Sequence, residues 1–325
     1  MKKWRRTLFK QIYRYTRPRS MRHMENAWPY LKIKQEASGA RSVSWRGRFL
    51  FESPPWERLL EWREKSPKAL IVATGPSIKE VDTSRFNEAF VIGVNGAIAL
   101  QDTQAVAFDA YVVVDPGFIR DRFNLFKRVI EQGIPCFLTF HCIRQACQID
   151  ENVLQGANII LVEFLNNRFN KPRLAADAFY RWAQEQEGLR LCSEVSPGND
   201  KVGFSLNPKL GFYDGATVAY WALQIAGNIG FDVIGIAGMD LGNANTAPRF
   251  YEREGDIVPS TLLNHYHSSI EPSFRLAVRV LQDRGQKAYN LSLISSLPEE
   301  IMPKLKINAF LDLEEVNEPV QHTSL

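Results

Sequence analysis

Seven short apolar runs rich in valine and isoleucine recur along this chain, and helical patterns lie between several of them. The runs are residues 69–74, 90–95, 110–115, 135–140, 158–164, 233–239 and 288–291. Near-continuous apolar runs of this length are typical of strands that are buried on both faces of a parallel sheet. Strands that alternate with helices form a layered sheet with crossover connections. The sequence therefore predicts an α/β fold that is Rossmann-like, with a mostly parallel sheet flanked by helices.

Four amphipathic segments are the predicted helices, at residues 120–132, 172–186, 215–228 and 274–284. Gly285 follows the last segment and is expected to cap that helix, because glycine readily adopts the left-handed conformation that ends helices. Residues 197–200 and 242–259 contain clustered turn residues and are predicted loops. The second of these is long enough to form a lid.

Charge is unevenly distributed along the sequence. Residues 1–48 contain 14 lysines and arginines against only Glu25 and Glu36, a local net charge of +12. The whole chain carries +4, which leaves −8 for the residues after position 48. This split predicts a basic amphipathic N-terminal arm (residues 1–50), an α/β domain (51–300) and a peripheral C-terminal tail (301–325).

The basic arm has an apolar stripe, because Leu8, Ile12 and Tyr15 follow helical spacing among the cations. This pattern favours an anionic membrane surface, where aromatic rings lie at headgroup level and each cation contributes ~1 kcal/mol. A solvated tail and a nucleic-acid-binding segment would carry the same charge, so charge alone leaves these alternatives open. We expect the membrane surface as the partner and not nucleic acid.

Several classes of protein are not expected from this sequence. No apolar stretch reaches the ~18 to 20 residues of a membrane span. A secretory signal has a continuous apolar region, but four cations interrupt the start of this chain: Lys10, Arg14, Arg17 and Arg19. The four cysteines show no CxxC spacing, so neither a disulfide scaffold nor a metal site is expected. The sequence thus predicts a cytoplasmic protein.

Polar residues end the first three predicted strands. Ligands of open parallel sheets bind beyond the carboxyl ends of the strands. The first run ends in Thr74, Gly75, Pro76 and Ser77, the second in Asn95 and the third in Asp115. Glycine lets a ligand approach the backbone, and serine can donate to a phosphate. Each residue alone also fits an ordinary turn, but three polar strand ends in succession predict a pocket.

Further candidates lie later in the chain. Asp214 or Thr217 is expected to cap the most apolar helix, where Gly215 and Ala216 would let an anion approach, and Asp240 ends the sixth run. The polar residues of the following region are Arg249, Tyr251, Arg253, His265, Tyr266 and His267. A histidine there is a candidate general base, although capping of the next helix is an alternative role. No DxD motif is present, so a metal that holds a sugar-nucleotide diphosphate is not expected.

Several segments together resemble a known group of enzymes. TGPSIKEVD, VIGVNGA, YVVVDPGF and GFYDGATVAYWALQIAGNIGFDVIGIAGMDL are similar, in this order, to motifs of the bacterial CMP-sialic-acid sialyltransferases. The chain is closer to the lipopolysaccharide-core WaaZ family, thought to transfer a third Kdo (an ulosonic acid) to the inner core. That resemblance extends over roughly residues 68–295 and includes VGF, GMDL, RFYE and YNLS.

The resemblance implies a GT-A-like variant of the Rossmann fold and an inverting, metal-independent glycosyltransferase. Its donor substrate would be CMP-Kdo, with no cofactor, and its acceptor a lipid A-core at the inner face of the inner membrane. Two alternatives remain, a CMP-sialic-acid-type sialyltransferase and a non-catalytic membrane-associated scaffold of core assembly. The residues implied for the donor nucleotide are Gly75, Pro76, Ser77, Asn95, Asp115, Ala216, Thr217 and Asp240. Tyr251 and Arg249 would meet the phosphate, and His267 or His265 would be the base. His267 is preferred because it lies just before a predicted helix start and so would face the pocket.

Overall fold

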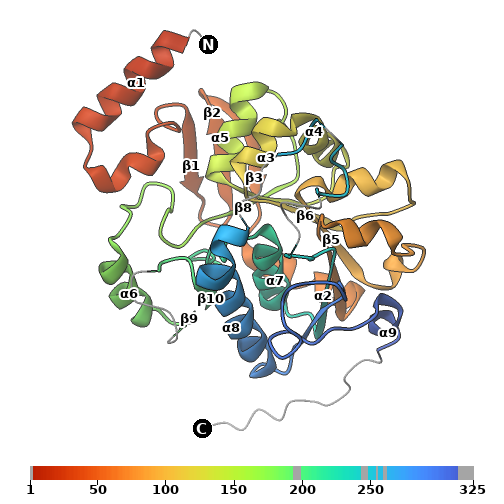
Figure 1. Ribbon diagram of the computed structural model, residues 1–325. Helices are drawn as coiled ribbons and strands as arrows, with labels where there is room; N and C mark the ends of the chain where they lie inside the picture. Colours follow the sequence, from red (N-terminus) through yellow and green to blue (C-terminus); the bar gives the residue numbers. More distant parts are fainter. Residues whose placement is uncertain (1–2, 193–198, 243–247, 254, 259–261, 314–325) are drawn as a thin grey trace.

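The seven apolar runs form one seven-stranded sheet in the computed structural model, which describes residues 3–192, 199–242, 248–253, 255–258 and 262–313 (Figure 1). The strand order is β12-β11-β4-β5-β6-β7-β8, and every neighbouring pair is parallel. The strands are β4 (Lys68–Val72), β5 (Phe90–Val94), β6 (Ala110–Val113), β7 (Cys136–Thr139), β8 (Ile159–Val162), β11 (Val233–Ala237) and β12 (Lys287–Asn290). The predicted Rossmann-like α/β fold is confirmed.

Each strand supplies side chains to two hydrophobic cores. In β4, Ala69 and Ile71 belong to one core, whereas Leu70 and Val72 belong to the other. Successive side chains of a strand point to opposite faces of the sheet, so a strand covered on both sides is apolar at every position. This packing explains why the runs in the sequence are continuous rather than alternating.

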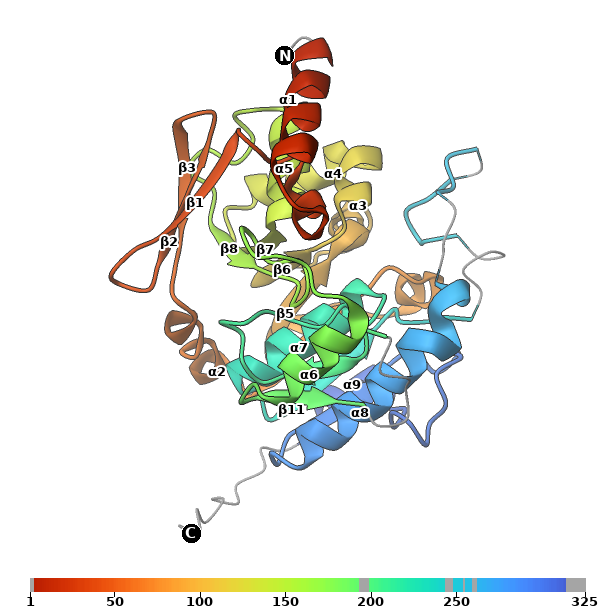
Figure 2. The same cartoon turned by 90° about the vertical axis from the view of Figure 1, so that its left-hand side faces the viewer.

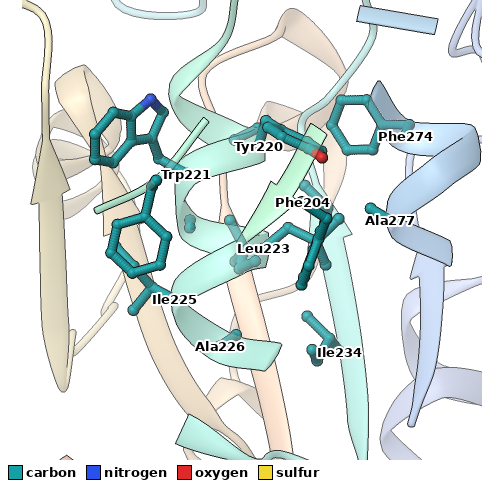
Figure 3. Close-up of a cluster of buried hydrophobic side chains, with 14 of the residues drawn as sticks. Phe204, Tyr220, Trp221, Leu223, Ile225, Ala226, Ile234, Phe274 and Ala277 are labelled. Carbon is teal, nitrogen blue, oxygen red and sulfur yellow. The ribbon is translucent and has the colours of Figure 1, made fainter. Parts of the chain in front are cut away.

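Helices cover both faces of the sheet. The core that contains Ala69 includes side chains of α6 (Ala176–Gln184), α7 (Val218–Ile229) and α8 (Glu271–Gln282). The opposite core includes those of α3 (Pro116–Asp121), α4 (Phe123–Glu131), α5 (Phe140–Ile149) and α9 (Ile307–Leu311). Figure 3 shows α7 with Trp221 on one side and Tyr220 on the side of Phe274 from α8. Because α7 is enclosed in this way, it is apolar nearly all round.

Shorter elements connect these layers. They are α2 (Trp62–Lys65), the antiparallel pair β9 (Leu189–Leu191) and β10 (Gly203–Ser205), the 3₁₀ helices η1 (Arg19–Met24), η2 (Trp56–Leu59), η3 (Pro76–Glu80), η4 (Phe86–Glu88), η5 (Asn95–Asp102) and η6 (Leu263–His265), and the π-helix η7 (Tyr266–Ile270). Gly285 follows α8 with φ +74°, the left-handed conformation expected of a cap.

Two predicted helices have different bounds in the structure. The segment 120–132 is not one helix, because Arg122 has φ −134° and ψ 43° and separates α3 from α4. The helix expected from residue 215 begins only at Val218, because Gly215 and Ala216 both have φ +55° and Thr217 caps the helix through its side chain. Residues in the left-handed region cannot continue a right-handed helix.

The segment expected as a basic arm contains a folded sheet. Residues 31–53 form β1 (Leu31–Gln35), β2 (Arg41–Trp45) and β3 (Arg48–Ser53), paired in the antiparallel order β1-β2-β3. Ser53 Oγ accepts a hydrogen bond from Leu161 N of β8 at 2.9 Å. Arg41 forms an ion pair with Glu163 at 3.3 Å, just beyond β8. This sheet therefore packs against the edge of the parallel sheet, which its basic composition did not indicate.

The first helix, α1 (Lys3–Thr16), is the part of the segment that stands away from the body (Figure 2). Phe9 and Tyr13 lie on its inner face and contact Trp28. Its exposed apolar side chains are Trp4, Leu8, Ile12 and Tyr15. No helix among the described residues is long and apolar enough to span a membrane.

The predicted C-terminal tail is partly folded. Phe310 and Leu311 of α9 are buried against the sheet. The last part of the predicted tail, residues 314–325, lies outside the described residues.

Candidate active site

A cavity of about 740 Å³ lies at the carboxyl ends of β4, β5, β6 and β11. The chain leaves β4 toward β5 on one side and returns to β11 on the other, so the cavity occupies the point where the strand order reverses. Ligands of open α/β sheets bind at this point. The sequence candidates that line it are Gly75, Pro76, Asn95, Asp115, Ala216, Thr217, Asp240, Arg249, Tyr251 and His265. Ser77 and His267 are not among its lining residues.

One wall of the cavity is a latch between two strand ends, formed by Gly75, Ser77, Gly238 and Asp240. Gly75 N donates to Gly238 O at 2.8 Å. The Asp240 carboxylate accepts hydrogen bonds from the backbone N, at 2.9 Å, and the hydroxyl of Ser77. A Cβ at Gly75 would overlap both Gly238 O and the Asp240 carboxylate, so glycine is required there. The Ser77 hydroxyl, expected to meet a phosphate, thus points at Asp240.

Several residues with strained backbone conformations line the cavity. Five non-glycine residues among those described have positive φ, and three of them line the cavity: Asn95, Ala216 and Leu241. Such strain persists where the surrounding structure enforces it, and it clusters at functional sites. Asn95 Oδ1 is also buried without a hydrogen-bond partner in the described part of the chain. A buried acceptor of this kind calls for an N–H or O–H donor, which a ligand would supply.

Tyr251 covers the end of β5. Its ring lies where a Cβ on Gly96 would be, so only glycine at position 96 leaves room for it. Burial raises the pKa of Tyr251 to about 12, with smaller effects of Arg249 and Glu252 in opposite directions. The phenol is therefore neutral near pH 7 and remains a hydrogen-bond donor beside the cavity.

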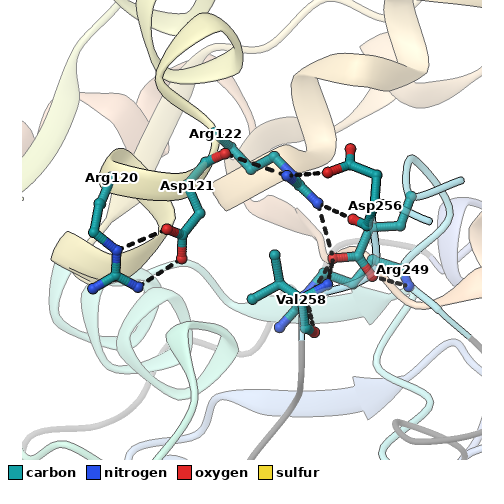
Figure 4. Close-up of polar contacts among 7 residues, drawn as sticks. Arg120, Asp121, Arg122, Arg249, Asp256 and Val258 are labelled. Carbon is teal, nitrogen blue, oxygen red and sulfur yellow. Dashed lines mark hydrogen bonds and ion pairs between the residues drawn. The ribbon is translucent and has the colours of Figure 1, made fainter.

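Two arginines beside the cavity share one buried carboxylate, and we call Arg122, Arg249 and Glu252 the arginine wall (Figure 4). The Glu252 side chain is 1% exposed and accepts a hydrogen bond from Arg249 Nη1 at 2.8 Å. Arg122 Nη2 lies 3.6 Å from the same Glu252 oxygen, Oε1. Glu252 also accepts from the backbone N of Arg249 at 3.0 Å and of Val258 at 3.2 Å, which ties these two residues together at the cavity.

Arg122 was not a candidate in the sequence, and Glu252 appeared there only as the last residue of the RFYE motif, with no role assigned. Arg122 was hidden inside a helix predicted to be continuous, whereas the real break at this residue turns its side chain toward Glu252 and Asp256 (Figure 4). A charged residue at a helix break that follows a strand end is a candidate for a site, so predicting the break would have indicated Arg122. The role of Glu252 as the shared carboxylate could not be predicted from the motif, because its partners are distant in sequence or depend on the loop's conformation.

The two loop histidines occupy different environments. His265 lines the cavity. The His267 side chain is 86% exposed, and its Nδ1 lies 3.0 Å from Glu271 Oε2 at the start of α8. The expectation that His267 faces the pocket does not hold, because the π-helix η7 carries that side chain to the surface. The other described histidine near a strand end, His141, has its pKa lowered to about 3, mainly by burial.

Comparison with known proteins identifies the family. A family model described as 3-deoxy-D-manno-octulosonic acid transferase WaaZ matches residues 56–308, more than half of the chain. This chain belongs to the WaaZ family. The match starts just after β3 and ends within α9, so it includes every residue that lines the cavity and leaves out α1 and the three-stranded sheet.

Two curated relatives agree with this assignment. A protein of Escherichia coli K12 named probable 3-deoxy-manno-octulosonic acid transferase is 24% identical over 252 residues, which covers 77% of this chain and 86% of the relative. A protein of the same name from Salmonella typhimurium LT2 is 22% identical over 243 residues, covering 75% and 88%. No solved structure matches the chain. The WaaZ resemblance expected from the motifs is therefore confirmed.

Within the described residues, no group of three or more histidine, cysteine, aspartate or glutamate side chains is arranged to hold a metal ion. The four cysteines are buried as free thiols, and burial raises the pKa of Cys142 and of Cys147 to about 12. These thiols are protonated near pH 7 and belong to the core.

Proposed function

We propose that this chain transfers Kdo from CMP-Kdo to a lipid A-core acceptor in lipopolysaccharide core biosynthesis. The family and the names of both relatives support a Kdo transferase. The observation that carries the choice of donor is the arginine wall, because an ulosonic acid linked to CMP has two adjacent anions, a phosphate and a sugar carboxylate. Guanidinium groups bind such oxygens through strong charge-assisted hydrogen bonds.

The arginine wall retains donors for these anions. Within the described residues, Arg249 makes its side-chain hydrogen bonds through Nη1 alone, to Glu252 and to Val258 O. Its Nε and Nη2 groups thus remain for a ligand. Arg122 donates through Nη1 to Asp121 O and Asp256 Oδ1 and through Nη2 to Asp256 O, which leaves its Nε without a hydrogen-bond partner among the described residues. The Asp256 carboxylate is 67% exposed, so its interaction is screened by solvent. We assign the donor phosphate to Arg249 and Tyr251, and the sugar carboxylate to Arg122.

The turn after β4 and the end of β5 would hold the nucleoside part of CMP. The turn after β4 presents backbone at Gly75 and Pro76, and Asn95 supplies the unpartnered Oδ1 for an N–H or O–H group of the nucleoside. The reaction would be an inverting single displacement, in which the acceptor oxygen attacks the anomeric carbon as the bond to CMP breaks. The neutral Tyr251 phenol and Arg249 would stabilise the charge that develops on the leaving phosphate, without a divalent metal.

We further propose that α1 attaches the protein to the anionic cytoplasmic face of the inner membrane. The stripe of Leu8, Ile12 and Tyr15 is exposed, whereas Phe9 and Tyr13 of the same helix pack on Trp28. The local charge of +12 over residues 1–48 complements anionic lipid. Replacing all three stripe residues by serine should weaken binding to vesicles that contain phosphatidylglycerol. Equal binding of the variant and the wild type would exclude this role.

The donor is tested by incubating the protein with CMP-Kdo and a lipid A-core acceptor while CMP release and product mass are followed. The proposal predicts CMP release, addition of one Kdo, and CMP binding by calorimetry in EDTA. Release only from CMP-sialic acid would indicate the sialyltransferase alternative. CMP binding without turnover of either donor would favour the scaffold alternative, and binding that requires magnesium would contradict metal independence.

A further inference from the structure

Five carboxylates line the cavity, and they differ in how they are satisfied: Asp115, Asp121, Asp214, Asp240 and Glu252. Asp240 belongs to the latch and Glu252 to the arginine wall. Asp115 accepts from Gly117 N at 2.7 Å, and Asp121 is bound by Arg120 through two hydrogen bonds. Asp214 makes no hydrogen bond through its side chain to any described residue. Its one ion pair there is with Lys201, at 3.8 Å.

We infer that Asp214 is the general base that deprotonates the acceptor hydroxyl. This inference rests on the proposed function, whose acceptor must lose a proton during transfer. The Asp214 carboxylate is 33% exposed, lines the cavity and retains its full capacity to accept a proton. The carboxylates engaged in the latch and in the arginine wall lack that freedom, since protonating either one would break the contacts that shape the cavity.

The backbone around Asp214 keeps this side chain in place. Tyr213 on one side is buried, and Gly215 N on the other donates to Lys201 O at 3.0 Å. Gly215 has φ +55°, and a Cβ there would overlap the Tyr220 ring, so the turn tolerates only glycine. A base held by a rigid turn meets its substrate in one geometry, which general-base catalysis requires.

The surrounding charges favour proton transfer near neutral pH. Burial raises the pKa of Asp214 above its ordinary 3.8, and the nearby Asp200 and Asp115 raise it further. Lys201 and His265 act in the opposite direction without reversing the shift. A base is more effective as its pKa approaches the working pH. His265 lies close enough to influence Asp214 and is the competing candidate.

The proposed step balances. The acceptor O–H proton moves to a carboxylate oxygen of Asp214, and the acceptor oxygen forms a bond to the anomeric carbon of Kdo. The bond between that carbon and the phosphate oxygen breaks, and its electron pair leaves with CMP. Asp214 then releases the proton to solvent.

The experiment compares wild type, Asp214→Asn and His265→Gln, with His267→Gln as a matched surface control. CMP affinity is measured by calorimetry, and CMP release from CMP-Kdo with acceptor is measured across pH. We expect Asp214→Asn to lose about 10²- to 10⁴-fold in kcat while its affinity for CMP stays within about threefold. His267→Gln should turn over like wild type. His265→Gln should keep the fall of kcat on the acid side, because that fall belongs to Asp214.

Other outcomes overturn the inference. Turnover of Asp214→Asn within about fivefold of wild type would exclude Asp214 as the base, and loss of the acid-side fall in His265→Gln would assign the base to His265. If Asp214→Asn does not fold, Asp214→Glu and formate rescue of Asp214→Ala replace it, and absence of activity in both contradicts the inference. A wild type that releases no CMP from CMP-Kdo refutes the proposed donor itself and removes this inference with it.

Discussion

The two walls of the cavity use buried charge in opposite ways. In the latch, the Asp240 carboxylate and both donors of Ser77 satisfy one another, so the strand ends are held together and little hydrogen-bonding capacity faces the cavity. In the arginine wall, one buried carboxylate holds two guanidiniums. The Nε and Nη2 groups of Arg249 have no hydrogen-bond partner among the described residues. A self-satisfied polar group shapes a site, whereas one with spare capacity binds a ligand. Residue type alone does not separate the two.

The largest effect is expected from Glu252→Ala. Removing this carboxylate leaves Arg249 without its ion-pair partner, leaves Arg122 with only the exposed Asp256, and frees the backbone N of Arg249 and Val258. Breaking a buried ion pair from one side costs about 3–5 kcal/mol. Chemical unfolding measures this loss, and CMP affinity should fall as well. Asp256→Ala is the control and should cost less than about 1 kcal/mol, because that carboxylate is exposed. Equal losses of unfolding free energy in the two variants would show that the buried Glu252 stabilises the protein no more than the exposed Asp256.

Tyr251→Phe tests whether the phenol that lies beside the arginine wall takes part in the reaction. The Tyr251 hydroxyl has no hydrogen-bond partner among the described residues, so its removal should leave the unfolding free energy unchanged. If the phenol stabilises the leaving phosphate, kcat should fall about 10²- to 10³-fold, the cost of losing one donor to a developing charge (≈ 2.7–4 kcal/mol). CMP release at saturating donor measures it. A loss of stability with normal kcat would make Tyr251 a structural residue of the lid.

Asp240→Ala tests the latch. The substitution leaves Ser77 N and its hydroxyl without their acceptor, and an unsatisfied buried group costs about 1–3 kcal/mol. Ser77→Ala should cost about 1 kcal/mol, and the double variant should be less destabilised than the sum of the two because they share one contact. Unfolding in denaturant measures all three. Additive effects would show that Asp240 and Ser77 do not act together, contrary to the hydrogen bonds between them.

The smallest effect concerns a satisfied carboxylate far from the cavity, Glu25. Burial raises its pKa, but hydrogen bonds from Arg14 and Lys10 outweigh this and leave the pKa below its ordinary 4.5. The contribution of Glu25 to docking α1 is therefore complete above pH 4.5 and is lost as the pH falls through the lowered value. Hydrogen exchange of α1 amides should speed up over that range. Glu25→Gln should show weaker protection and no such pH step.

The sequence by itself determined the layered fold. Continuous apolar runs are compatible with strands covered on both faces, and all seven runs proved to be strands of one parallel sheet. It also located several residues that line the cavity, because Asn95 and Asp115 end two of those runs and Gly75 follows a third. The WaaZ motifs could be recognised for a similar reason, because each motif is a continuous stretch of the sequence.

Only the tertiary structure decided which polar groups are free. Ser77 and Asp240 looked like ligand-binding residues in sequence, yet they bind each other across 163 positions. Nothing in the sequence indicated a contact between Arg122 and Glu252, yet they meet at the cavity from segments 130 residues apart. His267 and His265 are two positions apart and differ in whether they line the cavity. Local pattern specifies which backbone a segment adopts, but a side chain's remaining hydrogen-bonding capacity depends on partners that are brought close only by folding.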